Sequence, residues 1–193
     1  MTRWTVNIPN GESGNYKVAG ATNETGEDSW LNYVNYKNIP EGDYTVLYRK
    51  FGESWLNIMQ DTAQEYDDHA WLIPKMSGDI LIAGLGLGVV NVGLLANDAV
   101  TSVTIIEKEQ DVIDLVWDDC AKDDRFTLIH ADINTWKIPE GSSWNAGWFD
   151  TWLTSDESLS EYQTRMFERY GGFVGDINGW KWPSIPVKDE SIE

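Results

Sequence analysis

The order of apolar and polar positions divides the chain near residue 77. Before that point, short runs rich in Val, Thr and Tyr alternate with Gly, Asn and Pro, as in "WTVNIP", "NYKVAGAT" and "YTVLYRKF". Such runs predict β-strands joined by turns. "RKFGES" predicts a hairpin into a further strand. We therefore expect residues 1–76 to form a small antiparallel β region, closed by a short helix within "TAQEYDDHAWLIPKM".

Beyond residue 77 the pattern alternates between continuous apolar runs and helical spacing. The apolar runs "DILIAGL", "SVTIIEK", "RFTLIHAD" and "WNAGWFDTW" are typical of strands buried on both faces. Segments with apolar residues at helical spacing follow most of these runs. The alternation predicts an α/β fold, with a Rossmann-like, mostly parallel sheet and helices on both faces.

The end of the chain limits the size of this predicted sheet. A helix is expected in "SDESLSEYQTRMFERYG" and a last strand in "GGFVGDINGW". Too little chain remains after the fourth strand for a full seven-stranded sheet, so we expect the sheet to be shortened at the C-terminus. The expected Rossmann-like cofactor-binding domain spans residues 77–182, and residues 183–193 form a loose tail.

Composition narrows the classes of partner. The chain carries 32 acidic and 14 basic residues and a formal charge of −18. That charge argues against nucleic acid and anionic membranes, which need a positive field. It leaves room for a small-molecule substrate that is a cationic amine. With one cysteine, two distant histidines and no apolar stretch of 18 residues, we expect no disulfide, no metal site, no membrane span and a cytoplasmic location.

Three glycines follow the first strand of the predicted parallel sheet. Gly84, Gly86 and Gly88 lie where ligands bind in such sheets, beyond the carboxyl end of a strand. Glycine permits positive φ and lets the backbone approach a ligand closely. The spacing G-L-G-L-G is neither the dinucleotide fingerprint nor a phosphate P-loop. The loop by itself is compatible with a cofactor cradle or with a structural turn.

Polar residues end the next three predicted strands. Glu107 lies 23 positions after Gly84, where a carboxylate can accept both hydroxyls of a ribose. Asp132 can accept the amino group of adenine, and the N–H of Ile133 can reach a ring nitrogen. Asp150 ends the fourth strand. Each of them alone would be an ordinary strand-end residue, but together they indicate an adenosine cofactor.

These motifs resemble the class I S-adenosylmethionine-dependent methyltransferase fold, and within it most closely the spermidine synthase-like branch. Ile82 and Ala83 stand where many methyltransferases carry an acid, and Gln60 follows the expected hairpin, as in that branch. The likeness covers roughly residues 44–155. Proteins of this shape also occur in phage and environmental sequences.

The resemblance implies roles for the residues that match it. Gly84, Gly86 and Gly88 would cradle the methionine part of S-adenosylmethionine, or of its decarboxylated form. Glu107 would hold the ribose, and Asp132 with Ile133 would hold the adenine. Asp150 matches the catalytic acid that orients or deprotonates an attacking amine, because a protonated amine has no lone pair.

Weaker candidates surround this expected site. Gln60, Tyr66, Trp152 and Asp156 are candidate substrate contacts. Asp67, Asp68 and His69 are candidates to face a cationic substrate, but a solvated helix surface is the expected place for them. The sequence departs from the spermidine synthase pattern at Leu87, where that branch has an acid, and in "YDDHAW", which replaces a Tyr-His-Glu signature.

Three functions remain open from the sequence. The first is a transferase that uses S-adenosylmethionine, most simply a methyltransferase of unknown acceptor. The second is an aminopropyltransferase that uses decarboxylated S-adenosylmethionine and a polyamine. The third is a non-catalytic binding module that keeps the fold for a partner surface, for example in a homo-oligomer.

Overall fold

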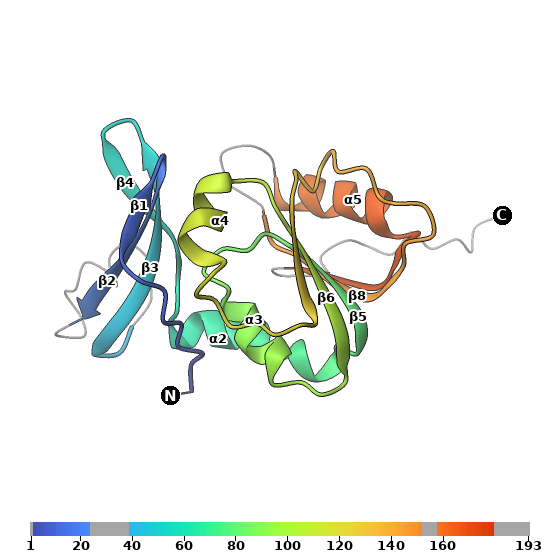
Figure 1. Ribbon diagram of the computed structural model, residues 1–193, viewed down its shortest axis with the longest axis horizontal. Coiled ribbons are helices and arrows are strands. Elements are labelled where there is room, and N and C mark those ends of the chain that lie inside the picture. Colours follow the sequence, from blue (N-terminus) through green and yellow to red (C-terminus); the bar gives the residue numbers. More distant parts are fainter. Residues whose placement is uncertain (1, 24–38, 152–157, 180–193) are drawn as a thin grey trace.

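The computed structural model describes residues 2–23, 39–151 and 158–179. Within them, one sheet is antiparallel with the strand order β1-β2-β3-β4, and the other has the order β7-β6-β5-β8-β9. Figure 1 shows the antiparallel sheet to one side of the larger sheet. The predicted α/β fold with a small antiparallel N-terminal region is confirmed.

The antiparallel sheet contains three of the predicted runs. Each strand pairs with the next in sequence. The expected hairpin turns at Gly52, whose φ is +58°, and Phe51 pairs with Ser54. The strands are β1 (Gly11–Ser13), β2 (Tyr16–Asn23), β3 (Gly42–Phe51) and β4 (Ser54–Gln60).

The prediction of a strand in "WTVNIP" is wrong. The segment belongs to no strand, and the backbone of Val6 bonds to side chains instead of a neighbouring strand. The Val6 N–H donates to Asp61 Oδ2 at 3.1 Å, and Thr45 Oγ1 donates to the Val6 carbonyl at 3.2 Å. Because these partners satisfy the backbone of Val6, the segment needs no ladder.

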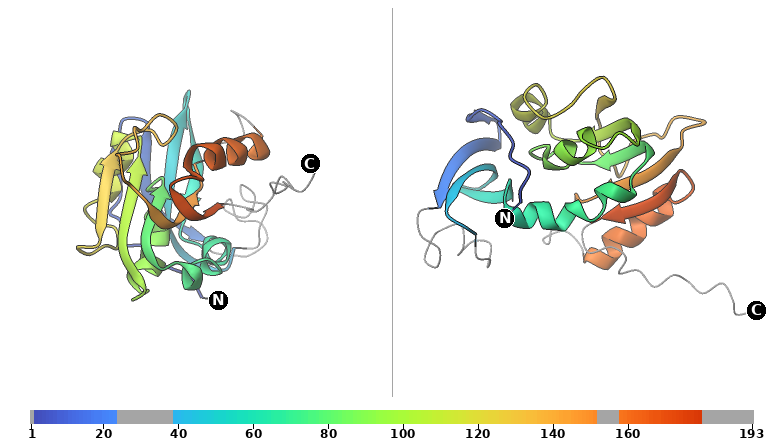
Figure 2. Two further views of the ribbon diagram at one scale, coloured as in Figure 1. Left: turned by 90° about the vertical axis from the view of Figure 1, so that its right-hand side faces the viewer. Right: turned by 90° about the horizontal axis from the view of Figure 1, so that it is seen from below.

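A short helical segment links the two sheets. Helix α2 (Ala63–Ala70) begins after Thr62, whose side chain accepts the Glu65 N–H. The 3₁₀ turn η1 (Ile73–Lys75) follows. In the view from below in Figure 2, α2 runs from the antiparallel sheet towards the larger sheet. The expected short helix is therefore present.

The larger sheet is parallel throughout its described strands. Its order reverses between β5 and β8, since β6 and β7 lie on one side of β5 and β8 and β9 on the other. Such a reversal opens a crevice at the carboxyl ends of the strands. The elements are β5 (Gly78–Ala83), α3 (Val89–Leu95), β6 (Val100–Glu107), α4 (Gln110–Val116), β7 (Phe126–His130), β8 (Trp144–Phe149), α5 (Leu159–Tyr170) and β9 (Val174–Gly179).

Helix α4 is shorter than its apolar spacing predicts. It ends at Val116, so Cys120 lies beyond it. Lys122 Nζ donates to the carbonyls of Trp117 and Asp118. A cation that bonds to the last carbonyls favours the end of a helix at that point.

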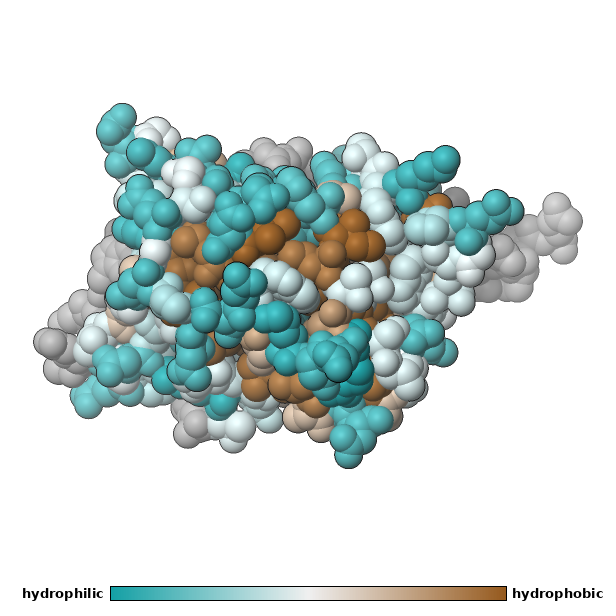
Figure 3. Space-filling view, in the orientation of Figure 1, coloured by the Kyte–Doolittle hydropathy of each residue, from teal (hydrophilic) through white to brown (hydrophobic). Residues whose placement is uncertain are grey.

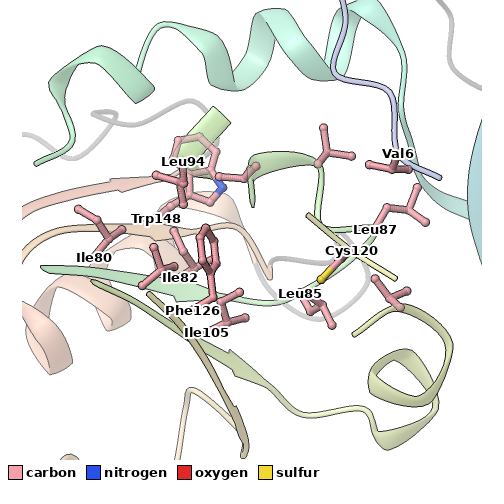
Figure 4. Close-up of a cluster of buried hydrophobic side chains, with 14 of the residues drawn as sticks. Val6, Ile80, Ile82, Leu85, Leu87, Leu94, Ile105, Cys120, Phe126 and Trp148 are labelled. Carbon is pink, nitrogen blue, oxygen red and sulfur yellow. The ribbon is translucent and has the colours of Figure 1, made fainter. Parts of the chain in front are cut away.

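Helices cover both faces of the parallel sheet, as predicted. Alternate residues of β5 point to opposite faces. Ile80 and Ile82 join the cluster with α3 and α4, whereas Leu81 and Ala83 join the cluster with α5. Figure 4 shows part of the first cluster, including Trp148 and Cys120. No helix of the described residues is long and apolar enough to cross a membrane.

Candidate functional site

A cavity of about 480 Å³ lies at the carboxyl ends of the parallel strands. Residues that follow β5, β6, β7 and β8 line it from the larger sheet. Tyr16, Arg49 and Met59 line it from the antiparallel sheet, and α2 contributes residues from a third side. Figure 3 shows apolar side chains gathered near the middle of the molecule, bordered by polar ones. The cavity thus occupies the crevice that the strand reversal predicts.

The three predicted glycines do not have equivalent positions. Gly84 and Gly86 line the cavity, with φ values of +87° and +52°. Gly88 has a φ of +68° but is not among the lining residues. A Cβ at Gly88 would lie 2.9 Å from Cys120 Cβ, so glycine there permits packing against the segment after α4.

Met59 approaches the glycine loop from β4. Its Sδ accepts the Leu87 N–H at 3.1 Å, and a Cβ at Gly86 would lie 2.4 Å from the same sulfur. The close approach that the sequence predicts for a ligand is made at Gly86 by this side chain. At Gly84, which also lines the cavity, a Cβ would lie 3.1 Å from Thr151 Cγ2.

Glu107 joins the end of β6 to the glycine loop. Its Oε2 accepts the Leu85 N–H, and its Oε1 accepts the Glu109 N–H, each at 2.8 Å. An ionised carboxylate offers about four acceptor positions. Glu107 is buried and lines the cavity. It can therefore hold the loop and still accept hydroxyl groups of a ligand.

Asp132 and Ile133 lie together at the end of β7. Asp132 Oδ1 accepts the N–H and the Nδ2 of Asn134, each at 2.8 Å. The Ile133 carbonyl accepts from Tyr170 and Arg169 of α5. Both residues line the cavity. Helix α5 thus fixes the backbone at the position that the sequence assigns to adenine.

Asp150 lies next to His69 of α2, and both line the cavity. The distance between Asp150 Oδ2 and His69 Nε2 is 3.8 Å. His69 is 2% exposed, so the expectation that it lies on a solvated helix surface is wrong. Trp148 packs against its ring, with centroids 4.8 Å apart. The spacing of three residues between Tyr66 and His69, on one face of a helix, was the signal that could have indicated burial.

The groups around His69 shift its pKa in opposite directions. Burial by itself lowers the pKa of His69. The Asp150 carboxylate, together with Glu65, outweighs burial and holds that pKa above its ordinary value of 6.5. Tyr162 differs, because burial raises its pKa to about 12 and it stays a neutral hydroxyl. This hydroxyl bonds to Thr151 and so fixes the backbone after Asp150.

Two of the four weaker substrate candidates, Gln60 and Tyr66, do not line the cavity. Gln60 is buried and accepts from Asn57 Nδ2 at 2.8 Å. Tyr66 packs edge-on against Trp4, with centroids 4.9 Å apart. Neither is among the residues that line the cavity. Trp152 and Asp156 lie outside the described residues.

The charges around the cavity are unequal. Three cations line it, namely Arg49, Lys108 and Arg165, apart from His69. Six carboxylates line it, namely Glu65, Asp68, Glu107, Glu109, Asp132 and Asp150. The described residues contain no cluster of three or more side chains suited to a metal ion. The cavity therefore favours a ligand with a positive charge.

No known protein family matches the sequence, and no curated protein matches it. Among solved structures, the chain is similar to a dimethyladenosine transferase from Plasmodium falciparum, with a TM-score of 0.43 and 14% identity over 57% of this chain and 37% of that one. It is similar to an S-adenosylmethionine-dependent methyltransferase from Clostridium acetobutylicum ATCC 824, with a TM-score of 0.44 and 12% identity over 58% and 48%. It is also similar to an Escherichia coli protein assigned as a methyltransferase, with a TM-score of 0.46 and 16% identity over 64% and 71%.

The chain spans less than two thirds of the length of the Plasmodium and Clostridium proteins. These similarities are remote and concern only the fold. We therefore argue the function of the cavity from the residues that line it.

Proposed function

We propose that the protein is an S-adenosylmethionine-dependent methyltransferase whose acceptor is a cationic amine. One observation carries this proposal. The glycine loop after β5 and the carboxylates that end β6, β7 and β8 all open into one cavity at the strand reversal. Glu107, Asp132 and Asp150 come from three separate strands, and each offers an acceptor that an adenosyl ligand or an amine needs.

The residues of the cavity are compatible with this cofactor. S-adenosylmethionine supplies an electrophilic methyl group on a sulfonium. Glu107 would hold the ribose with the acceptor positions that the loop leaves free. Asp132 and Ile133 would hold the adenine, and the backbone at Gly84 would contact the methionine part. The excess of carboxylates favours a sulfonium over the pyrophosphate of a dinucleotide.

Asp150 is the group proposed to meet the acceptor. It is 28% exposed and lines the cavity. Its carboxylate can bind an ammonium group and orient the nitrogen for attack. Glu65 and Asp68 of α2 line the same region and add negative charge. A cationic amine is therefore the acceptor class that these side chains suit.

Methyl transfer is preferred over aminopropyl transfer. The loop has no acid at Leu87, which is fully buried in the core. It thus adds no charged side chain at the position where the spermidine synthase-like branch has one. The assignment to that branch stays a prediction.

Calorimetric titration tests the proposal. The purified protein should bind S-adenosylmethionine and S-adenosylhomocysteine more tightly than 5′-methylthioadenosine or NAD. Asp132→Asn keeps the shape of the side chain but turns an acceptor into a donor opposite the adenine amino group. We expect about tenfold weaker binding of S-adenosylhomocysteine, as for the loss of one charged hydrogen bond.

Asp79→Asn is the matched control. Asp79 belongs to the same sheet but lies at the amino end of β5, where it accepts from Thr101 and Ser102. Its substitution should leave the affinity unchanged. Failure of the wild-type protein to bind either S-adenosyl ligand would contradict the proposed function. Equal affinity in Asp132→Asn and the wild type would contradict the assignment of adenine to Asp132.

A further inference from the structure

One buried nitrogen in the cavity wall has no hydrogen-bond partner in the part of the chain that the structure describes. His69 Nδ1 lies 2.6 Å from the Glu65 carbonyl oxygen. Because a carbonyl only accepts, Nδ1 carries a proton and donates it. The other nitrogen, Nε2, is buried and unpartnered among the described residues. A buried polar atom without a partner costs free energy, so its retention needs a reason.

The surroundings of His69 direct that nitrogen towards Asp150. Among the described residues, the charged groups that face the ring are Glu65 on α2 and Asp150 after β8, each 3.8 Å from a ring nitrogen. Trp148 packs against the ring at an interplanar angle of 60°. The lone pair of a neutral Nε2 therefore faces a carboxylate oxygen with no proton between them. A proton placed there would satisfy both atoms.

A carboxylate alone is a weak proton acceptor at neutral pH. Its ordinary pKa lies several units below that of an amine, whereas an imidazole titrates near neutrality. The nearby carboxylates raise the pKa of His69 further. Asp150 is positioned to contact an acceptor amine, and His69 is positioned to accept a proton from Asp150. Together the two side chains could deprotonate the amine.

We propose that Asp150 and His69 form a proton-accepting pair, in which Asp150 contacts the amine and His69 takes up the proton through it. The ammonium group gives one proton to a carboxylate oxygen of Asp150 and becomes a neutral amine with a free lone pair. Asp150 gives one proton from Oδ2 to Nε2 of His69 and returns to the carboxylate, and His69 becomes an imidazolium. This inference rests on the proposed function, and His69 acts as a positioning residue.

The two histidines of the chain make a direct test possible by NMR. In the wild type, the His69 resonance should titrate with a pKa above 6.5. In Asp150→Asn, which removes the facing charge, the His69 pKa should fall by about one unit or more. His130 is exposed, and its Nε2 lies 3.0 Å from the Lys108 carbonyl, so it serves as the internal reference. An unchanged His69 titration in folded Asp150→Asn would overturn the pair.

The pH dependence of turnover tests the transfer itself, with putrescine as the probe amine. The wild-type kcat should fall as pH drops through the His69 pKa, because His69 must be neutral to take a proton. In His69→Gln, kcat should no longer fall as pH drops through this range, and kcat at pH 7 should be about a hundredfold lower than in the wild type. The affinity for S-adenosylhomocysteine should stay within about twofold of the wild-type value. His130→Gln should behave as the wild type.

The outcomes separate the two proposals. If the wild-type protein does not bind S-adenosylhomocysteine, the proposed function is wrong. If the wild type binds S-adenosylhomocysteine and the pH dependence of kcat in His69→Gln equals that of the wild type, the proton-accepting pair is wrong. The proposed function is then unaffected. The NMR titration needs no turnover, so it decides the coupling of His69 and Asp150 by itself.

Discussion

Single residues in the cavity wall often serve packing and binding at the same time. Glu107 bonds the glycine loop through Oε2 and the backbone of Glu109 through Oε1, and it still lines the cavity. Gly84 and Gly88 both have positive φ, but only Gly84 lines the cavity. At this scale, the position of a residue in the sequence motif does not distinguish a binding role from a structural role.

The structural role of Gly88 can be measured. Gly88→Ala forces an alanine into positive φ and brings its Cβ to 2.9 Å from Cys120 Cβ. Gly52→Ala, at a similar φ and with nothing within 4 Å, is the control for strain alone. Denaturant unfolding should show a loss of about 1 kcal/mol for Gly52→Ala and about 3 kcal/mol for Gly88→Ala. Equal losses would contradict the packing role.

Among the elements, α2 decides the composition of the cavity. It lies between the two sheets in the chain and carries Glu65, Asp68 and His69 to the cavity wall. Its eight residues are too few for a stable isolated helix, so its caps and contacts hold it in place. Thr62 begins the helix from a buried position.

The cap of α2 gives a prediction at this scale. The side chain of Thr62 accepts the Glu65 N–H at 3.3 Å. Thr62→Ala removes both this acceptor and a buried methyl group, whereas Thr62→Ser removes only the methyl group. Urea unfolding should find Thr62→Ala less stable than Thr62→Ser by about 1 kcal/mol. Equal stability of the two variants would show that the cap contributes nothing.

The charge of the whole molecule works against its compact state. The formal charge is −18 on 193 residues. These like charges lie closer together in the folded chain than in the unfolded one, so their repulsion destabilises the folded state. Part of this negative charge lies around the cavity, which six carboxylates line. The remainder lies largely on the surface, where salt screens it.

Salt should therefore stabilise the protein. Between about 0.01 and 0.5 M NaCl the Debye length falls from about 30 Å to a few Å, and the thermal midpoint should rise by several degrees. Most of the rise should occur at the low end of this range. The thermal midpoint is measured by calorimetry or circular dichroism at constant pH. Sucrose at equal osmolarity is the control for effects of added solute. A flat midpoint would mean that surface repulsion is negligible.

Much of the fold could be predicted from the sequence, because the signals are local. The apolar runs that end at Ala83 and Phe149 read directly as buried strands, and Gly52 indicated its hairpin turn. The residues that end the parallel strands could also be assigned, since parallel strands bring their carboxyl ends to one edge. "WTVNIP" failed because the side chain of Asp61, far along the chain, replaced a neighbouring strand as its partner.

The sequence by itself determined the order of elements and the strand-end carboxylates Glu107, Asp132 and Asp150, because periodicity and glycine act over a few residues. Only the tertiary structure decided which other side chains meet them. The antiparallel sheet places Met59 on the glycine loop, and α2 turns His69 towards Asp150. These contacts depend on how two sheets pack around one cavity, and packing joins residues whose spacing in the chain carries no signal.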